Sequence, residues 1–382
     1  MTIRELRTYV LSAPLERPFY SALAGSVTRR ASLVVEALTD EGLSGFGEAL
    51  CHGRQPPQLA QSVAEHSLRE LVLGRDPFEA GVLWEEMYNR TKDFGMKGAV
   101  VGAISAVDIA LWDLMGKAVG KPVHNLLGGA FRTTVQPYAT GFYRSDGGRY
   151  PDALVEEALG YVERGFTAFK VKIGFGVEDD LRTVAAIRRA VGPGVRIMVD
   201  ANHAYNAGVA RRLIRGLEPH DVFWLEEPIS PEDVDGYAEL RAMGSPMLIA
   251  GGENEFTRHG FWTWITRRAL DVLQPDIAAA GGFTGLRQIQ DLALAAGLLV
   301  NPHVWGTAIG LAASLQFLAV VPPSPISRGS YHPMLEYDQS AHPFRRELVE
   351  QPADMKDGLV AVPDRPGLGI EVNRSALEQF AR

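Results

Sequence analysis

Charged or ionisable residues stand at the end of one strand-like segment after another in the second half of this chain. From about residue 133 onward, short apolar runs of strand type alternate with helical stretches. Successive end positions lie between 23 and 28 residues apart, and they are Lys172, Asp200, Glu226, Glu253, Asp276 and His303. That spacing is typical of βα units, which build a parallel sheet. This many units favour closure into a barrel, whose active site lies where the strands end.

The rest of the chain has a different pattern. Residues 3–12 and 31–38 are rich in β-branched residues and predict two strands, and the glycines at 42, 45 and 47 predict a turn-rich stretch after them. Residues 58–128 have helical apolar spacing. The segment from Met355 predicts short strands and glycine turns outside the barrel. The fold class is therefore α/β, with an α+β region before the barrel.

Length and composition exclude several classes of protein. With 382 residues the chain can bury a large core. Its net charge of −8 argues against a nucleic-acid or anionic-membrane partner. We find no signal peptide at the start and expect no apolar run of membrane-spanning length. Cys51 is the only cysteine, so no intrachain disulfide can form and we expect a cytoplasmic protein. We interpret Cys51 as a small buried hydrophobe rather than a nucleophile.

Three of the strand-end residues are carboxylates on consecutive predicted strands. Asp200 ends the run RIMVD, Glu226 lies in WLEEP and Glu253 lies in AGGEN. Neighbouring strands bring these acids to one place, where three uncompensated negative charges are costly. A hard divalent cation resolves this repulsion, and oxygen-only ligands suit Mg²⁺ better than zinc. The alternative is that each acid pairs with an arginine or lysine at the rim.

Two lysines and a histidine–aspartate pair accompany this predicted metal site. Lys170 and Lys172 are two residues apart, so both side chains point to the same side of their strand. We expect a second ammonium and a metal ion nearby to lower the pKa of a lysine towards that of a general base. Asp276 and His303 end consecutive strands, and a carboxylate bonded to one imidazole nitrogen fixes the tautomer. The alternatives are surface lysines and a purely structural hydrogen bond.

These groups suit the removal of a proton next to a carboxylate. Such a proton is weakly acidic because its removal leaves two negative charges on one enediolate. A metal ion at the carboxylate oxygens stabilises that charge where it develops. A base on one face and an acid or second base on the other then complete either elimination or epimerisation.

The ordered motifs resemble those of the enolase superfamily, and in particular of its mandelate racemase subgroup. They are KVK at 170–172, VDAN at 199–202, WLEEP at 224–228, GGEN at 251–254, QPD at 274–276 and the strand of His303. The stretch ALWDLMGKAVGKPVHNLLGG is similar to the family's signature where the capping domain joins the barrel. Together these motifs span almost the whole chain.

The resemblance implies a fold and an assembly. The barrel would be a modified TIM barrel of (β/α)7β type over residues 131–345. An α+β capping domain would comprise residues 1–130, and the C-terminal segment 346–382 would return to it. The family's habit is a homo-oligomer that acts on a small-molecule carboxylate.

The resemblance also implies roles for individual residues. Mg²⁺ would be the cofactor, with the three acids named above as its ligands. Lys172 would be one acid/base, with Lys170 beside it at the substrate carboxylate. His303, supported by Asp276, would be the opposite acid/base. Glu336 in PMLEYD would contact the substrate carboxylate or the enediolate.

Within the subgroup, the stretches FKVKIGFGVEDDLR, NPHVWGTAIG and PMLEYDQSAHPFR look closest to galactarolactone cycloisomerases. Such an enzyme removes the proton α to the carboxylate of a sugar-acid lactone and expels the ring oxygen, giving a 3-deoxy-2-keto acid. An aldarate dehydratase or a hydroxy-acid racemase would use the same groups. Candidate substrate-binding residues in the loops 18–29 and 51–56 and near the site are Tyr20, His52, Arg54, His203 and Trp305. His203 has a further alternative as a base, since some dehydratases place one there.

Three other functions remain alternatives at this point. A class I aldolase would form a Schiff base on Lys172, but it needs no trio of metal-binding acids. A metal-dependent sugar isomerase has no use for the paired lysines. A non-catalytic scaffold would be expected to have lost a ligand or a base, and every such position is filled.

Overall fold

The computed structural model describes residues 1–23, 25–51, 55–324 and 331–381. The chain begins with an antiparallel sheet in the order β1-β2-β3 (Ile3–Phe19, Val27–Thr39 and Ser44–Cys51). The first two strands confirm the predicted pair, although both extend beyond the predicted ends. The prediction of turns for residues 42–47 was wrong beyond Gly42, because the third strand begins at Ser44.

The third strand contains two glycines because a helix lies directly against it. A Cβ added at Gly45 would lie 2.2 Å from the carbonyl oxygen of Ala110, and one at Gly47 would lie 1.9 Å from that of Ala106. Both carbonyls belong to α4 (Ala99–Val119). The glycines therefore permit close packing of sheet on helix rather than a turn.

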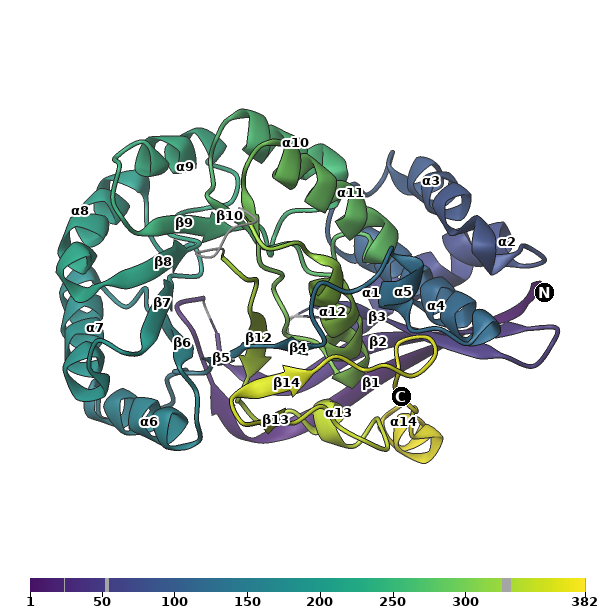
Figure 1. Cartoon of the computed structure of the whole chain (residues 1–382), viewed down its shortest axis with the longest axis horizontal. Coiled ribbons are helices and arrows are strands. Elements are labelled where there is room, and N and C mark those ends of the chain that lie inside the picture. Colours follow the sequence, from purple (N-terminus) through teal and green to yellow (C-terminus); the bar gives the residue numbers. More distant parts are fainter. Residues whose placement is uncertain (24, 52–54, 325–330, 382) are drawn as a thin grey trace.

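Helices cover one face of this sheet (Figure 1). They are α1 (Pro57–Val63), which continues through a π-helical turn (Ala64–Leu68) into α2 (Arg69–Val72), then α3 (Ala80–Thr91), α4 and α5 (Val123–Leu126). Among the described residues, α4 is the one helix long and apolar enough to cross a membrane, which we had not expected from the sequence. An apolar stretch of 18 residues in this helix is 83% buried inside the protein, as in a core helix.

Eight parallel strands form the second part of the molecule. Their order is β11-β10-β9-β8-β7-β6-β5-β12. Asn301, just after β11, accepts hydrogen bonds from the Met334 amide (2.8 Å) and the Tyr331 hydroxyl (2.7 Å) ahead of β12. The two edges of the curled sheet are thereby joined. The strands are β5 (Pro137–Thr140), β6 (Ala168–Lys172), β7 (Arg196–Asp200), β8 (Val222–Glu226), β9 (Leu248–Gly251), β10 (Val272–Leu273), β11 (Leu299–Val300) and β12 (Leu335–Asp338).

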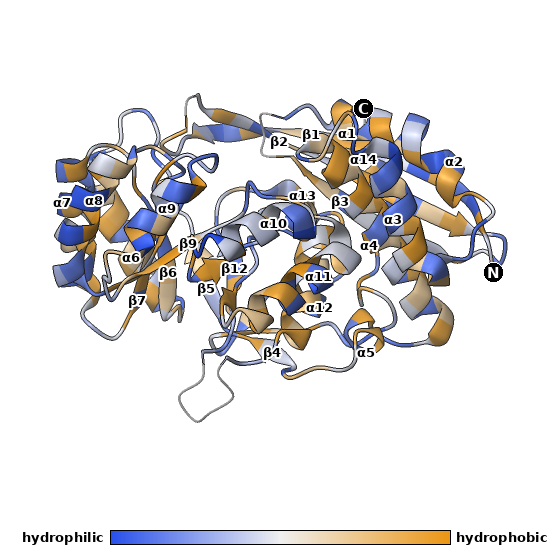
Figure 2. Cartoon of the chain, turned by 90° about the horizontal axis from the view of Figure 1, so that it is seen from above, coloured by the Kyte–Doolittle hydropathy of each residue, from blue (hydrophilic) through white to orange (hydrophobic). Residues whose placement is uncertain are grey.

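A helix follows most of these strands and lies outside the sheet (Figure 1). These helices are α6 (Asp152–Glu163), α7 (Val177–Val191), α8 (Ala207–Leu217), α9 (Val234–Arg241), α10 (Thr257–Thr266), α11 (Gly282–Ala295) and α12 (Ala308–Val320). In Figure 2, α7 and α8 carry both hydrophilic and hydrophobic residues, as expected of helices with one face on a core. In contrast, α12 is buried along its whole length. The predicted α/β barrel is confirmed.

The C-terminal segment returns across the molecule to the N-terminal sheet. The strands β13 (Met355–Lys356) and β14 (Leu359–Ala361) pair with β4 (Thr134–Val135) beside the barrel. A short helix α13 (Pro343–Arg346) precedes them, and α14 (Arg374–Phe380), which we had not predicted, lies against β1. The chain's last elements therefore link its first sheet to the barrel.

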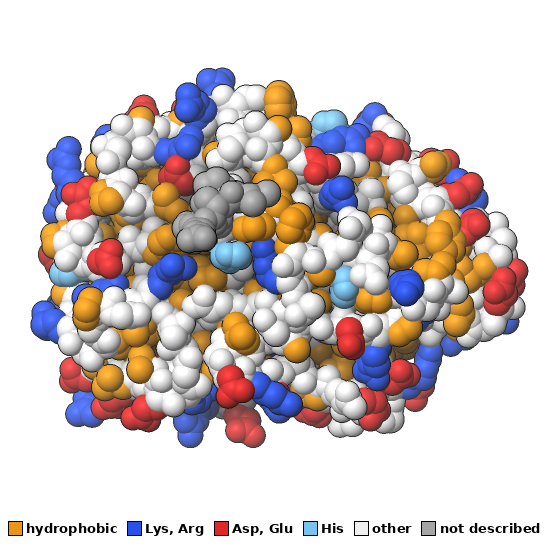
Figure 3. Space-filling model, viewed as in Figure 1, with side chains coloured by type: hydrophobic (Ala, Val, Ile, Leu, Met, Phe, Trp, Pro, Cys, Tyr) orange, Lys and Arg blue, Asp and Glu red, His pale blue; other side chains and the backbone are white. Residues whose placement is uncertain are grey.

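Charged side chains of both signs are mixed over the face shown in Figure 3. Outside the grey atoms, this face has no wide area of a single charge.

Candidate active site

Three acids converge at the ends of neighbouring barrel strands. Asp200 and Glu226 are the last residues of β7 and β8 and are paired across them, and Glu253 follows β9. All three are buried, and one carboxylate oxygen of each lies within 4.8 Å of the others. Glu253 Oε2 accepts no hydrogen bond from the described part of the chain. Such a set of converging oxygens suits a hard divalent cation.

The neighbours of Asp200 and Glu226 fix their orientations. The Lys172 ammonium lies 2.5 Å from Asp200 Oδ2, and the Asn202 amide donates to Oδ1 at 2.8 Å. Glu226 accepts hydrogen bonds from the Gln274 amide (2.7 Å) and the Trp224 indole (3.2 Å). Burial opposes ionisation of Asp200, but the two lysine charges outweigh it and lower its pKa. Burial raises the pKa of Glu226 to about 7.

The charges around this point do not balance. Five buried carboxylates lie around two lysines and a histidine. The acids are Asp200, Glu226, Glu253, Asp276 and Glu336. The cationic groups are Lys170, Lys172 and, when it is protonated, His303. Burial raises the pKa of Glu227, a further buried acid next to Glu226. With the five acids ionised and the three other groups protonated, the excess of two negative charges would match one divalent cation. The residues present therefore fit the expected metal.

The two lysines of β6 occupy different surroundings. Lys170 is fully buried, and its ammonium contacts Glu226, lies 2.7 Å from Glu336 Oε1 and lies 3.6 Å from Asp200 Oδ2. Burial would lower the pKa of Lys172, but the negative groups around it, Asp200 first among them, together outweigh burial, and the pKa lies above the usual lysine value. We had expected a lowered value. A cation bound by Asp200 would weaken this upward effect, because it offsets the carboxylate's charge.

On the other side of the site, Asp276 and His303 are paired as predicted. The two residues form a parallel bridge, and His303 Nδ1 lies 2.7 Å from Asp276 Oδ2. Asp276 Oδ1 accepts the Ala278 amide at 2.7 Å. The other ring nitrogen, Nε2, lies 3.4 Å from Glu253 Oε2. Burial would lower the pKa of His303, but the charges of Glu253 and Glu336 outweigh it and raise the pKa to about 10.

Glu336 lies on β12 and joins the two sides of the site. Its carboxylate accepts hydrogen bonds from the Thr140 hydroxyl at 2.8 Å and the Val304 amide at 3.1 Å. Burial opposes its ionisation, but the charges of Lys170 and His303 outweigh burial and hold the pKa of Glu336 far below its usual range.

A cavity of about 80 Å³ opens onto this cluster. Its walls include Lys172, Glu253, His303 and Glu336, and the remaining lining residues are Phe19, Ser21, Leu23, Val27, Tyr143, Asn202 and Trp305. Four residues of this wall come from β1, β2 and the segment between them, so the N-terminal sheet closes the barrel mouth. Lys170 and Asp276 are not among the lining residues.

The aromatic part of the wall was only partly predicted. The indole of Trp305 donates to the Tyr143 hydroxyl at 3.0 Å, and the Arg30 guanidinium lies 4.2 Å from the Trp305 ring centroid. The Phe19 and Tyr143 rings are 4.3 Å apart. Sequence analysis identified Trp305 but missed Phe19 and Tyr143. Tyr143 was open to prediction because it lies just after the end of β5, as Asp276 and His303 lie just after β10 and β11.

The other predicted substrate-binding residues lie elsewhere or outside the described chain. Tyr20 pairs through its backbone with Arg144 and does not line the cavity. His203 is half-buried, donates its amide to the Glu227 carbonyl at 2.6 Å, and does not line the cavity either. His52 and Arg54 fall outside the described residues. Cys51 is buried and burial raises its pKa to about 12, as suits an inert thiol.

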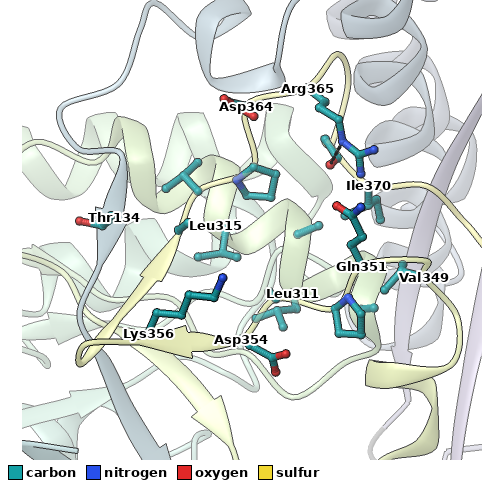
Figure 4. Close-up of a pocket in the computed structure, with 18 of the residues that line it drawn as sticks. Thr134, Leu311, Leu315, Val349, Gln351, Asp354, Lys356, Asp364, Arg365 and Ile370 are labelled. Atoms are coloured by element: carbon teal, nitrogen blue, oxygen red, sulfur yellow. Dashed lines mark hydrogen bonds between the residues drawn. The ribbon is translucent and has the colours of Figure 1, made fainter. Parts of the chain in front are cut away.

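A larger cavity of about 690 Å³ lies between α12, β13, β14 and the segment 349–370 (Figure 4). Leu311 and Leu315 form an apolar side, and Lys356 and Asp354 stand at its edge. It contains none of the acids, lysines or histidine of the cluster. Size alone does not make it the reactive site.

Two family models together match most of the chain. Residues 5–128 match the mandelate racemase / muconate lactonizing enzyme N-terminal domain, and residues 153–376 match the enolase C-terminal domain-like family. A curated relative, D-galactarolactone cycloisomerase of Agrobacterium fabrum (strain C58 / ATCC 33970), is 41% identical over 383 residues, which cover 100% of this chain and 99% of the relative. Arabinonate dehydratase of Saccharolobus solfataricus (strain ATCC 35092 / DSM 1617 / JCM 11322 / P2) is 34% identical and covers 99% of both.

Solved structures agree with this assignment. The 3,6-anhydro-D-galactonate cycloisomerase from Zobellia galactanivorans superposes with a TM-score of 0.89 at 36% identity, with both chains fully covered. A racemase from Streptomyces coelicolor A3(2), solved with bound magnesium, gives 0.88 at 30% identity with the same coverage. The chain therefore belongs to the mandelate racemase / muconate lactonizing enzyme family of the enolase superfamily, as an isomerase or lyase.

Proposed function

We propose that this enzyme removes the proton α to the carboxylate of a sugar acid or its lactone, in a Mg²⁺-dependent reaction. The proton loss is followed by β-elimination to a 3-deoxy-2-keto acid, as in a galactarolactone cycloisomerase. The observation that carries the proposal is that Lys172 and His303, from β6 and from just after β11, reach the same small cavity. Glu253 and Glu336 line the same cavity. Glu336 also contacts Lys170, and Glu253 lies near His303.

Asp200, Glu226 and Glu253 would hold the Mg²⁺. When bound there, the ion would stabilise the two negative charges that develop on the substrate carboxylate as its α proton leaves. The convergence of the three carboxylates, and a Glu253 oxygen that accepts no hydrogen bond from the described residues, support this assignment.

Lys172 and His303 would exchange protons with the substrate. The Asp276 carboxylate would accept a hydrogen bond from His303 Nδ1. Nε2 is then the nitrogen that would face the reacting carbon or the leaving oxygen in the cavity. Lys172 Nζ would act at the α carbon. We had expected Lys170 at the substrate carboxylate, but its burial among Glu226 and Glu336 supports a role in holding those acids in place.

The cavity wall would exclude water and orient the sugar ring. Trp305, Tyr143 and Phe19 supply apolar surface, and the tyrosine hydroxyl is already paired with the indole. An uncharged ring therefore suits this side of the cavity, while the carboxylate belongs on the acid-and-metal side.

A sugar-acid dehydratase is the second candidate. The similarity to an arabinonate dehydratase over nearly the full length favours it, because a dehydratase would use the same α-proton removal with hydroxide in place of the ring oxygen as leaving group. A racemase would return the proton to the opposite face and would form no keto acid.

The test is incubation with Mg²⁺ and a panel of hexarates and their lactones in D₂O. Proton NMR follows the α position, and a semicarbazide assay detects 2-keto acid. We expect keto acid from a galactarolactone, abolished in Lys172→Ala and in His303→Asn. Lys356→Ala, which changes an exposed lysine at the edge of the larger cavity, is the matched control and should retain activity.

Other outcomes assign other functions. Keto acid only from an open-chain acid supports the dehydratase. Deuterium at the α carbon without keto acid supports a racemase or epimerase. Full activity in Lys172→Ala contradicts the proposed chemistry.

A further inference from the structure

A buried carboxylate of the N-terminal sheet contacts the barrel next to the predicted acid/base. Glu48 lies in the middle of β3 and is fully buried. Its carboxylate accepts hydrogen bonds from the Thr307 amide (2.9 and 3.1 Å to the two oxygens), the Thr307 hydroxyl (2.6 Å) and the Gly310 amide (2.8 Å). Within the part of the chain that the structure describes, its own sheet contributes one side-chain donor, the Ser32 hydroxyl at 2.7 Å. Most of its partners therefore lie more than 250 residues away.

These contacts hold the start of helix α12. Thr307 is the residue before the helix, and its hydroxyl also accepts the Ile309 amide at 3.1 Å. The glycines on either side leave room for Glu48, since a Cβ at Gly306 or Gly310 would lie 2.7 or 2.8 Å from its oxygens. The carboxylate thus packs directly against the backbone that leads out of the His303 segment.

The charge of Glu48 is balanced by backbone and hydroxyl donors. Within the described residues, no arginine, lysine or histidine forms an ion pair with it. Burial raises its pKa, and the donors of Thr307 act in the opposite direction. Hydrogen bonds from several donors to one buried carboxylate fix the geometry of the groups that they join.

The residues between His303 and Thr307 are held by side chains of α13 and β12. Arg345 donates to the carbonyl oxygens of Gly306 (2.9 Å) and Val304 (3.2 Å). Glu336 accepts the Val304 amide at 3.1 Å. Arg345 and Glu336 therefore hold the backbone of residues 304–306, and Glu48 holds Thr307. This backbone directly follows His303 and includes Trp305.

We propose that Glu48 is a positioning residue that sets the orientation of the segment 303–307, and through it the His303 imidazole and the Trp305 wall of the cavity. The N-terminal sheet then takes part in proton transfer although it carries no reacting group. This inference rests on the proposed function for its effect on rate. The effect of Glu48 on the orientation of the His303 imidazole does not depend on the proposed function, because it follows from the contacts in the fold.

Glutamine cannot reproduce these contacts. Both carboxylate oxygens accept backbone amide donors, so either orientation of the new amide would direct N–H groups at an N–H of Thr307 or Gly310. A displacement of about 1 Å at a reacting group can cost on the order of 100-fold in rate. We therefore expect Glu48→Gln to lower kcat at least about tenfold with little change in KM, because no group that binds the substrate is removed.

Thr307→Val provides a second variant, since it removes the hydroxyl, which donates to Glu48 and accepts the Ile309 amide, and retains the backbone amide of residue 307. The matched control is Asp113→Asn. Asp113 is also a buried carboxylate that accepts amides from distant segments, those of Phe46 (2.9 Å) and Leu368 (2.8 Å), but it lies away from the cavity.

The first measurement is ¹⁵N NMR of the histidine-labelled protein without substrate, with the His303 signals assigned by their loss in His303→Asn. We expect these signals to move in Glu48→Gln and in Thr307→Val and to stay in place in Asp113→Asn. Unchanged His303 signals in both test variants, or an equal movement in the control, overturn the proposal. If Glu48→Gln does not fold, Thr307→Val against Asp113→Asn decides the question.

The second measurement is kcat and KM on the substrate found by the panel. A fall in kcat confined to the Glu48 and Thr307 variants supports the positioning role, whereas equal kcat values in all three variants contradict it. Absence of activity in the unaltered enzyme refutes the proposed function, but the NMR comparison still tests Glu48.

Discussion

Replacement of Asp276 by asparagine separates orientation of His303 from metal binding. Asp276 Oδ1 accepts the Ala278 amide at 2.7 Å, so the new side chain keeps its carbonyl oxygen there and turns its NH₂ group towards His303 Nδ1. The imidazole must then accept at Nδ1 and carry its proton on Nε2. The nitrogen that faces the cavity can no longer act as a base, and the pKa of His303 falls with the loss of the Asp276 carboxylate.

The size of the effect follows from the bond that is lost. A buried hydrogen bond to a charged group contributes about 1.5–3 kcal/mol. At about 1.4 kcal/mol for each factor of ten, kcat/KM should fall by about 10- to 150-fold. The affinity for Mg²⁺ should not change, because Asp276 is not one of the three converging acids.

The assay is the initial rate of keto-acid formation at saturating Mg²⁺, with Mg²⁺ affinity measured by isothermal titration calorimetry. Asp113→Asn is again the control for loss of a buried carboxylate. A kcat/KM within twofold of the unaltered enzyme would show that Asp276 does not orient a reacting imidazole. A parallel loss of Mg²⁺ affinity would place Asp276 in the metal site instead.

Three further predictions concern the metal, the core and the cysteine. Mg²⁺ at 100 times its Kd should stabilise the fold by about 2.7 kcal/mol, seen as a rise in Tm that Glu253→Gln abolishes; no rise in the unaltered protein contradicts the metal site. Gly47→Ala should destabilise the protein by at least about 1–3 kcal/mol in urea denaturation, since the new Cβ would lie 1.9 Å from the Ala106 carbonyl; an unchanged midpoint is the contrary result. Cys51, whose pKa is raised to about 12, should stay unreactive towards a thiol reagent at pH 8 until the protein is unfolded in urea, and rapid native labelling would refute its burial.

The barrel and the core of the site were predictable because they depend on local order in the chain. Strand-end residues at regular intervals must meet at one end of a parallel barrel, whatever the details of packing. Asp200, Glu226 and Glu253 accordingly converge, and His303 pairs with Asp276. No knowledge of side-chain rotamers was needed for these results.

The failures come from contacts between distant segments. Gly45 and Gly47 looked like turn residues, but they lie in a strand because α4 packs against them. Phe19 lines the cavity only because β1 reaches the barrel mouth, which local patterns do not encode, whereas Tyr143 follows β5 and was open to prediction. Tyr20, one residue after Phe19, was predicted in its place. In an extended strand a shift of one residue moves a side chain to the other face.

The pKa of Lys172 shows a different limit. From the sequence we weighed only the second lysine and the metal, both of which lower the pKa of an ammonium. The structure places the Asp200 carboxylate 2.5 Å away, and its charge raises the pKa instead. The outcome depends on which neighbour is nearest, and that distance is a property of the folded site.

The central claim is that the bond between the α carbon and its hydrogen breaks in the cavity lined by Lys172 and His303. The most direct test compares single turnovers of ordinary and α-deuterated galactarolactone. A single turnover is needed because product release can otherwise mask the chemical step. The account predicts Mg²⁺-dependent keto-acid formation that is measurably slower with the deuterated substrate and absent in Lys172→Ala. Equal rates for the two substrates, or turnover that survives in Lys172→Ala, would contradict it.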